Sequence, residues 1–144
     1  MKERSYVMVK PEFANNNFVV EEVERRLTNA GLKIEEAHYV NYDVDHARQH
    51  YAEHIGKGFY PDLEKYITSD KAFGMIVSGE NAIATIRTLA GSTKNPAEGT
   101  IRYDIPFFLH LPMRVTENVV HSSDGEEAAK IELAIFEELL KKHN

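Results

Sequence analysis

A histidine near the end of the chain is placed where it could act on an anion. His121 ends the apolar run Val119-Val120, and it comes just before Ser123 and Glu126, which have the spacing of a helix capping box. A helix N-terminus favours anions, so the ring would lie on a rigid element beside an anion site. A histidine merely packed at a strand end is the commoner case, at roughly four in five on spacing alone. Since the chain has seven histidines, spacing does not single out His121.

Composition narrows the chemistry and the partners that are open to this chain. It has 144 residues, no cysteine and a formal net charge of -6. Without cysteine there is no disulfide, thiolate metal site or cysteine nucleophile. The acidic balance argues against a broad nucleic-acid surface, although a few lysines and arginines can still build a local anion site. Neither a Gly-rich Walker loop nor a GxGxxG motif is present, so a nucleotide would need other phosphate contacts.

Length and hydropathy predict one cytoplasmic domain. Residues 1–144 contain no repeat, low-complexity stretch or linker, and their number suits a single domain with its own core. The first residues lack the apolar stretch of a signal peptide, and no apolar run approaches the ~20 residues of a membrane helix. We therefore expect a cytoplasmic protein with no membrane partner and no specific nucleic-acid partner.

The elements that must position His121 follow from the pattern of apolar and turn residues. Strands are predicted at Tyr6–Val9, Lys33–Asn41, Ala72–Ser78 and Asn118–His121. Helices are predicted at Val20–Ala30, Asp45–His54, Pro61–Ile67, Asn81–Ala90 and from Ser123 through Leu140, with a loop at Ser92–Gly99. The core order is βαββαβ.

This order favours an α+β fold, a ferredoxin-like βαββαβ sandwich. It has an antiparallel sheet with helices on one face, here with an extra C-terminal helix. The competing doubly wound parallel fold needs a helix between strands at every step. The predicted strand at Leu32–Tyr42 fits that requirement badly.

Short motifs along nearly the whole chain resemble those of the nucleoside diphosphate kinase family. Each motif is weak alone, but their number and order make the resemblance specific. They are Tyr6-Val7-Met8-Val9-Lys10-Pro11, His50-Tyr51-Ala52-Glu53-His54, Lys57-Gly58-Phe59-Tyr60, Gly79-Glu80-Asn81-Ala82-Ile83 with Arg87, Gly91-Ser92-Thr93, Asn95-Pro96, Gly99-Thr100-Ile101-Arg102 and Asn118-Val119-Val120-His121-Ser122-Ser123-Asp124, followed by Glu132. The resemblance implies transfer of the γ-phosphoryl group from nucleoside triphosphates to nucleoside diphosphates, by a ping-pong mechanism and with broad base specificity.

The resemblance implies a nucleophile and two supporting residues. His121 matches the family's nucleophile, which takes the phosphoryl group on Nδ1, and a ring with a pKa of ~6.5 is mostly neutral near pH 7. Glu132 matches the carboxylate that bonds the other ring nitrogen and fixes the tautomer, although alone it would be interpreted as part of a solvated helix face. Ser123 matches the serine beside the histidine, and helix capping is its other role.

Four further matches concern the phosphates. Lys10, Arg87 and Arg102 match the family's phosphate-binding cations, and Thr93 matches the hydroxyl that joins them. Phosphoryl transfer needs positive charge on the equatorial oxygens and on the leaving phosphate. For each cation the ordinary alternative is a surface ion pair. This alternative is weakest for Lys10, which follows an apolar strand. The resemblance also implies Mg²⁺ as cofactor, held mainly by the nucleotide phosphates and not by a protein metal site.

Three matches concern the base and the sugar. Phe59 matches the aromatic residue that stacks on the base, a contact that tolerates every base because each has a π-face. Core packing is the alternative for Phe59, favoured at about two to one on the sequence alone. Tyr51 matches a site residue near the phosphoryl group and the ribose, and Asn118 matches the amide that bonds the sugar hydroxyl.

The chain departs from the family pattern at four places. Glu12 stands where Asp is usual, and Ser122 stands where Gly usually follows the histidine, which predicts a crowded phosphoryl pocket. Loop 93–102 is shorter than usual by about two residues and segment 102–118 longer by about six. In the family this loop helps to shape the nucleotide site and takes part in subunit contacts, so the resemblance implies an effect on nucleotide affinity and assembly. These departures leave open a binding or regulatory module without turnover. An RNA-binding ferredoxin-like domain is disfavoured, because the chain is acidic and lacks an aromatic RNP-type strand.

The resemblance also implies a homo-oligomer, a tetramer or hexamer built on dimers. The apolar segment Ile105–Pro112 supports this expectation independently, because it would form a large apolar patch on a monomer. We expect it to be buried, either at a subunit contact or against its own domain.

Overall fold

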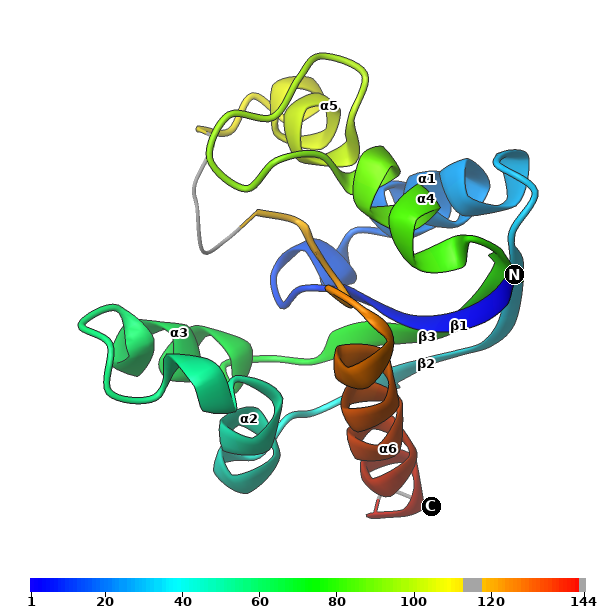
Figure 1. Cartoon of the computed structure of the whole chain (residues 1–144). Helices are drawn as coiled ribbons and strands as arrows, with labels where there is room; N and C mark the ends of the chain where they lie inside the picture. Colours follow the sequence, from blue (N-terminus) through cyan, green and yellow to red (C-terminus); the bar gives the residue numbers. More distant parts are fainter. Residues whose placement is uncertain (113–117, 143–144) are drawn as a thin grey trace.

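The computed structural model describes residues 1–112 and 118–142, and a four-stranded antiparallel sheet lies at its centre (Figure 1). The strands are β1 (Lys2–Val9), β2 (Lys33–Val40), β3 (Ala72–Glu80) and β4 (Val120–Ser122), in the spatial order β2-β3-β1-β4. Every neighbouring pair is antiparallel. The predicted antiparallel sheet is confirmed, and the parallel alternative is excluded.

The helices complete the βαββαβ order and add to it. They are α1 (Asn17–Asn29), α2 (Val44–His50), α3 (Tyr60–Ile67), α4 (Ala82–Ala90), α5 (Ile101–Phe108) and α6 (Glu126–Lys142), with short 3-10 turns η1 (Phe13–Asn15) and η2 (Ala52–His54). The ferredoxin-like fold with an extra C-terminal helix is thus confirmed. Among the described residues, no helix is long and apolar enough to cross a membrane.

Helices cover both faces of the sheet, which corrects the expectation of one covered face (Figure 1). The helices α1, α4 and α5 pack on one core, into which β1 points Val7 and Val9. The helices α2, α3 and α6 pack on a second core, which receives Tyr6 and Met8. Successive strand residues point to opposite faces, so the unbroken apolar run of β1 already indicates a strand covered on both sides.

The apolar segment Ile105–Pro112 is only partly buried within the chain. Helix α5 was not predicted, and Pro106 in its interior explains why, since proline is disfavoured there. The side chain of Ile105 is fully buried, whereas Phe107 is 62% exposed and Phe108 50%. The family departure in segment 102–118 extends over residues 113–117, which lie outside the described residues.

Candidate active site

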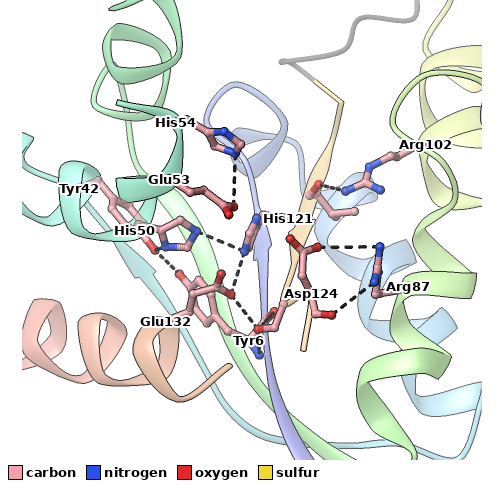
Figure 2. A network of polar contacts seen from close by, with 12 residues as sticks. Tyr6, Tyr42, His50, Glu53, His54, Arg87, Arg102, His121, Asp124 and Glu132 are labelled. Carbon is pink, nitrogen blue, oxygen red and sulfur yellow. Dashed lines mark hydrogen bonds and ion pairs between the residues drawn. The ribbon is translucent and has the colours of Figure 1, made fainter. Parts of the chain in front are cut away.

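Nine of the ten predicted site residues line one cleft, between the α2–α3 region and the α4–α5 region. They are Lys10, Tyr51, Phe59, Arg87, Thr93, Arg102, Asn118, His121 and Glu132. The tenth, Ser123, is fully buried beside Glu132. Residues separated by more than a hundred positions therefore meet at one place, as a site requires (Figure 2).

A tight turn and a short strand position His121. The ring lies on β4, paired with Met8 of β1. Before it, Val119 has a φ of 78° and the Val120 amide donates to the Asn118 carbonyl at 3.0 Å, which is a γ-turn. A β-branched residue in this conformation is strained, and the Lys10 amide, donating to the Val119 carbonyl at 2.8 Å, helps to hold it. Strain of this kind concentrates at functional sites.

One ring nitrogen of His121 is engaged by a carboxylate. Its Nε2 lies 2.9 Å from Glu132 Oε1 (Figure 2). The Ser123 hydroxyl donates to the same oxygen at 2.7 Å and accepts from the Tyr6 amide at 3.1 Å. An N–H at Nε2 leaves the lone pair at Nδ1, the atom that the resemblance names as the nucleophile.

The predicted capping box of Ser123 and Glu126 is wrong. Helix α6 begins at Glu126, and the Ala129 amide donates to the Gly125 carbonyl, so Gly125 occupies the capping position. The Ser123 hydroxyl is instead used by Glu132 and β1. The spacing signal failed because a tertiary partner competes for the same hydroxyl.

His50 is a site residue that the sequence did not single out. It is the last residue of α2, its exposed fraction is 8%, and its Nε2 lies 3.2 Å from Nε2 of His121. Its other nitrogen, Nδ1, lies 3.4 Å from the Tyr42 hydroxyl. The motif His50-Tyr51 was recognised, but a role was predicted only for Tyr51. Its spacing of three residues from Ala47 places it on the buried side of α2, a signal that predicts burial but not the partner.

Burial sets the charge states at the bottom of the cleft. Desolvation, followed by the charge of Lys10, lowers the pKa of His121 to about 3, so the ring is neutral near pH 7. Desolvation, followed by the charge of Arg102, lowers the pKa of Lys10 to about 7. Burial raises the pKa of Glu132. A neutral imidazole beside several cations can attack an electrophile that carries negative charge.

The cations at the cleft donate to an amide oxygen and to backbone carbonyls. Lys10 Nζ donates to Asn118 Oδ1 at 2.7 Å, and Arg87 donates to the Asp124 carbonyl at 3.3 Å. Arg102 donates to the carbonyls of Gly91 at 2.6 Å and Val120 at 2.9 Å. Within the described residues, the buried Nε of Arg102 and the buried hydroxyl of Tyr51 have no hydrogen-bond partner. Such groups are expected to gain partners from a ligand.

The outer part of the cleft is more open. Phe59 is 47% exposed and lies 5.4 Å, centroid to centroid, from the ring of His54, so it is not a core residue. Thr93 is exposed on the loop that follows α4. Ser122 is buried, pairs with Val7 and also lines the cleft. Its effect on the phosphoryl pocket stays a prediction, while Glu12, with a φ of 77°, lies away from the cleft lining.

The similarity to known proteins decides the family. A protein-family model described as nucleoside diphosphate kinase matches residues 3–139. The chain belongs to the nucleoside diphosphate kinase family. Its relatives include the nucleoside diphosphate kinase of Listeria monocytogenes, which is 42% identical over 137 residues, covering 93% of this chain and 88% of the relative. That of Methanocaldococcus jannaschii is 39% identical, covering 94% of each chain.

A solved structure of the same family has the same fold. It is a halophilic nucleoside diphosphate kinase from Halobacterium salinarum in complex with CDP, 35% identical, with a TM-score of 0.83 over 94% of this chain and 88% of that one. The reaction of the family moves a phosphoryl group from a nucleoside triphosphate to a nucleoside diphosphate. The chain is therefore a nucleotide-binding phosphotransferase, as the resemblance predicted.

Enzymes of this family use a divalent metal ion, and the cleft fits one that arrives with its nucleotide. Among the described residues, the one cluster with metal-ligating atoms close together is His50, His121 and Glu132. Two imidazoles and one carboxylate suit zinc or iron better than Mg²⁺, which prefers six oxygens and keeps several waters. The lysine and arginines around the cleft would bind phosphate oxygens and leave others for the ion.

Proposed function

We propose that His121 is the nucleophile and carries the phosphoryl group between the two nucleotides. Support comes from its position: the ring lies in the cleft, one nitrogen bonds Glu132, and cations that include Lys10 and Arg102 act on the ring. One observation carries most weight, the 2.9 Å contact between His121 Nε2 and Glu132, because a proton on Nε2 would leave the lone pair on Nδ1.

In the first half-reaction the Nδ1 lone pair of His121 attacks the γ-phosphorus of a nucleoside triphosphate. A bond forms between Nδ1 and phosphorus, the bond from phosphorus to the β–γ bridging oxygen breaks, and the nucleoside diphosphate leaves. The ring gains positive charge, and Glu132 stabilises it through the Nε2 proton. A second diphosphate then attacks the phosphohistidine in the reverse step, which is a ping-pong mechanism.

The phosphates are held by four residues in this scheme. Lys10, Arg87 and Arg102 bind oxygens of the transferred and leaving groups, and the Thr93 hydroxyl joins them. We propose that the divalent ion is Mg²⁺, held mainly by the nucleotide phosphates and water, where it neutralises phosphate charge. Ser123 acts through Glu132, since it donates to the oxygen that bonds His121.

In this scheme the base is bound by stacking, and no side chain recognises its hydrogen-bonding edge. Phe59, half exposed at the outer part of the cleft, stacks on any base. Asn118 and Tyr51 contact the sugar and the phosphoryl region. We infer broad base specificity, and the CDP in the halophilic relative is consistent with acceptance of a pyrimidine.

The test is labelling by radioactive ATP without an acceptor. Wild-type protein should become labelled and lose the label in acid, because the N–P bond of phosphohistidine is acid-labile. A His121→Ala variant should lose labelling and turnover together while keeping its circular dichroism spectrum. Glu132→Gln should reduce turnover less, since the nucleophile is still present.

The controls separate this scheme from its alternatives. A folded His121→Ala variant with full activity, or an acid-stable label on Ser122 or Ser123, would show that the nucleophile is another residue. A wild-type protein that binds nucleotides yet forms no triphosphate would be the regulatory module that Ser122 leaves open.

The domain organisation, assembly and location of the protein are also proposed from the sequence. We propose that residues 1–144 form one domain, that the protein is a homo-oligomer built on dimers, and that it works in the cytoplasm. Its proposed partners are nucleoside tri- and diphosphates.

A further inference from the structure

His50 belongs to a chain of polar groups that ends at the proposed nucleophile. The chain runs from the Tyr6 hydroxyl to that of Tyr42 at 2.8 Å, from Tyr42 to His50 Nδ1 at 3.4 Å, and from His50 Nε2 to His121 Nε2 at 3.2 Å (Figure 2). The two imidazole rings meet edge to face, with centroids 4.5 Å apart. The proposed function gives His50 no part.

With Glu132 ionised, the contacts allow one consistent placement of the protons. Glu132 Oε1 receives a hydrogen bond from Ser123, and its 2.9 Å contact with His121 needs a proton on Nε2 of that ring. A second proton on the facing Nε2 of His50 would collide with it at 3.2 Å. His50 therefore presents a lone pair to His121 and carries its own proton on Nδ1, directed at Tyr42.

The opposite placement is unfavourable on two counts. If His50 donated from Nε2, His121 would carry its proton on Nδ1 and have no lone pair there for attack. The carboxylate of Glu132 would then face the lone pair of His121 Nε2 at 2.9 Å. A buried pair of acceptors without a proton between them is costly.

We propose that His50 is a positioning residue, whose Nε2 lone pair and Nδ1 proton hold His121 in the tautomer with a reactive Nδ1. This inference rests on the proposed role of His121. His50 contacts the nucleophile through the nitrogen that does not react, so its effect falls on the chemical step.

The surroundings keep His50 in this state. Desolvation and the neighbouring His121 lower the pKa of His50 well below its usual value, which keeps the ring neutral. Glu132 acts in the opposite direction and Lys10 in the same one. Burial raises the pKa of both Tyr6 and Tyr42, so the phenols keep their protons and can accept from His50 and pass the hydrogen bond on.

Neutron diffraction from the deuterated wild-type enzyme near pH 7 tests the proton placement without any substitution. Deuterons should lie on Nε2 of His121 and on Nδ1 of His50. A deuteron on Nδ1 of His121, or on Nε2 of His50, would overturn the inference. Because this measurement uses the unphosphorylated protein, its result is independent of whether His121 is later found to be the nucleophile.

Kinetics of single-turnover labelling test the consequence. His50→Leu should lower the rate of phosphoenzyme formation about tenfold, the scale of one lost neutral hydrogen bond, with a much smaller change in KM. His50→Gln, whose amide can offer an acceptor to His121 and a donor to Tyr42, should recover most of the rate.

The matched control is His46→Leu, because His46 lies one turn earlier on α2 and bonds Asp43 outside the cleft lining. This variant should label at the wild-type rate. Equal losses in His50→Leu and His50→Gln, or an unchanged rate in both, would overturn the positioning role. Failure of wild-type labelling on His121 would instead refute the proposed function.

Discussion

Lys10 carries a charge that burial makes costly, and this has a measurable effect on pH dependence. Its exposed fraction is 7%, and desolvation lowers its pKa to about 7. As the pH rises through this value the free enzyme loses the proton, so kcat/KM should fall above pH 7, where ATP is already deprotonated. A bound phosphate favours the charged lysine, so kcat should depend on pH less than kcat/KM.

The control for this prediction is Lys10→Arg, because arginine stays protonated throughout the range. Steady-state rates of the variant between pH 7 and 9 should not show the alkaline fall in kcat/KM, even if its absolute activity is lower. An identical fall in both proteins would assign the titration to another group.

Phe59 gives a prediction about specificity. Removing the ring in Phe59→Ala should weaken binding of purine and pyrimidine diphosphates alike, by about 1–3 kcal/mol per base, with little change in kcat. The measurement is KM for ADP, GDP, CDP and dTDP in a coupled assay. Discrimination among bases well beyond that range in the wild type would mean that a side chain reads the base edge.

At the residue scale, the family motifs allowed the sequence to predict nine of the residues that line the cleft. Composition and spacing alone did not separate His121 from the other histidines, nor Phe59 from a core residue. His50 was missed because its role depends on a contact across 71 positions, which no local pattern records. Ser123 was assigned a local cap because that pattern is local, whereas its real partners are Tyr6 and Glu132.

Helix α5 brings Arg102 to the cleft, and a partly buried ion pair attaches α5 to α1. Arg26 lies 2.9 Å from Asp104 of α5 and 2.7 Å from Glu22 of its own helix, and all three side chains are at most 15% exposed. Asp104 also accepts from the Gly99 amide at 2.9 Å, so the start of α5 is fixed from two sides. The ion pair lies outside the cleft lining, but it fixes the start of the helix that carries Arg102.

We predict that Arg26→Ala will raise KM for nucleotides several-fold more than it lowers kcat, because Arg102 loses its support. Removing Arg26 also leaves two partly buried carboxylates without their cation, so the melting temperature should fall. The specific readout is a double-mutant cycle: in an Arg102→Ala background, Arg26→Ala should change KM little. Arg25→Ala is the matched control, since Arg25 bonds the same Glu22 but is exposed. Additive effects of Arg26 and Arg102 would contradict the link.

At the element scale, the sequence predicted the strands and most helices closely. The two errors, a sheet with only one covered face and the missing helix α5, both arose from tertiary context. The run Tyr6–Val9 was correctly a strand, yet the cover on its second face depends on α6, which follows some 120 residues later. Helix α5 was hidden by Pro106, and contacts with Arg26 stabilise it in spite of the proline.

Three exposed phenylalanine side chains gather where α1 and α5 meet. Phe18 of α1 lies 6.5 Å from Phe108, centroid to centroid, Phe107 lies 6.2 Å from Phe108, and Tyr103 stacks on Phe107. Phe18, Phe107 and Phe108 are each about half exposed or more. Contiguous apolar surface of this kind usually marks a contact with another protein.

We therefore predict that this aromatic patch is buried between subunits of the proposed homo-oligomer. Replacing Phe107 and Phe108 by serine should shift the mass measured by light scattering at micromolar concentration toward smaller species, because each subunit contact loses its apolar core. It should also make the melting temperature depend less on protein concentration, because a dissociated subunit unfolds without a change in the number of molecules. Val44→Ser is the matched control, since Val44 is 43% exposed on α2, away from the patch.

A wild-type protein that is monomeric under these conditions would refute the oligomer. An oligomer that survives both substitutions would place its contacts on another surface. The next surface to examine would be β2, an edge strand of the described sheet, because an edge strand can pair with a second copy.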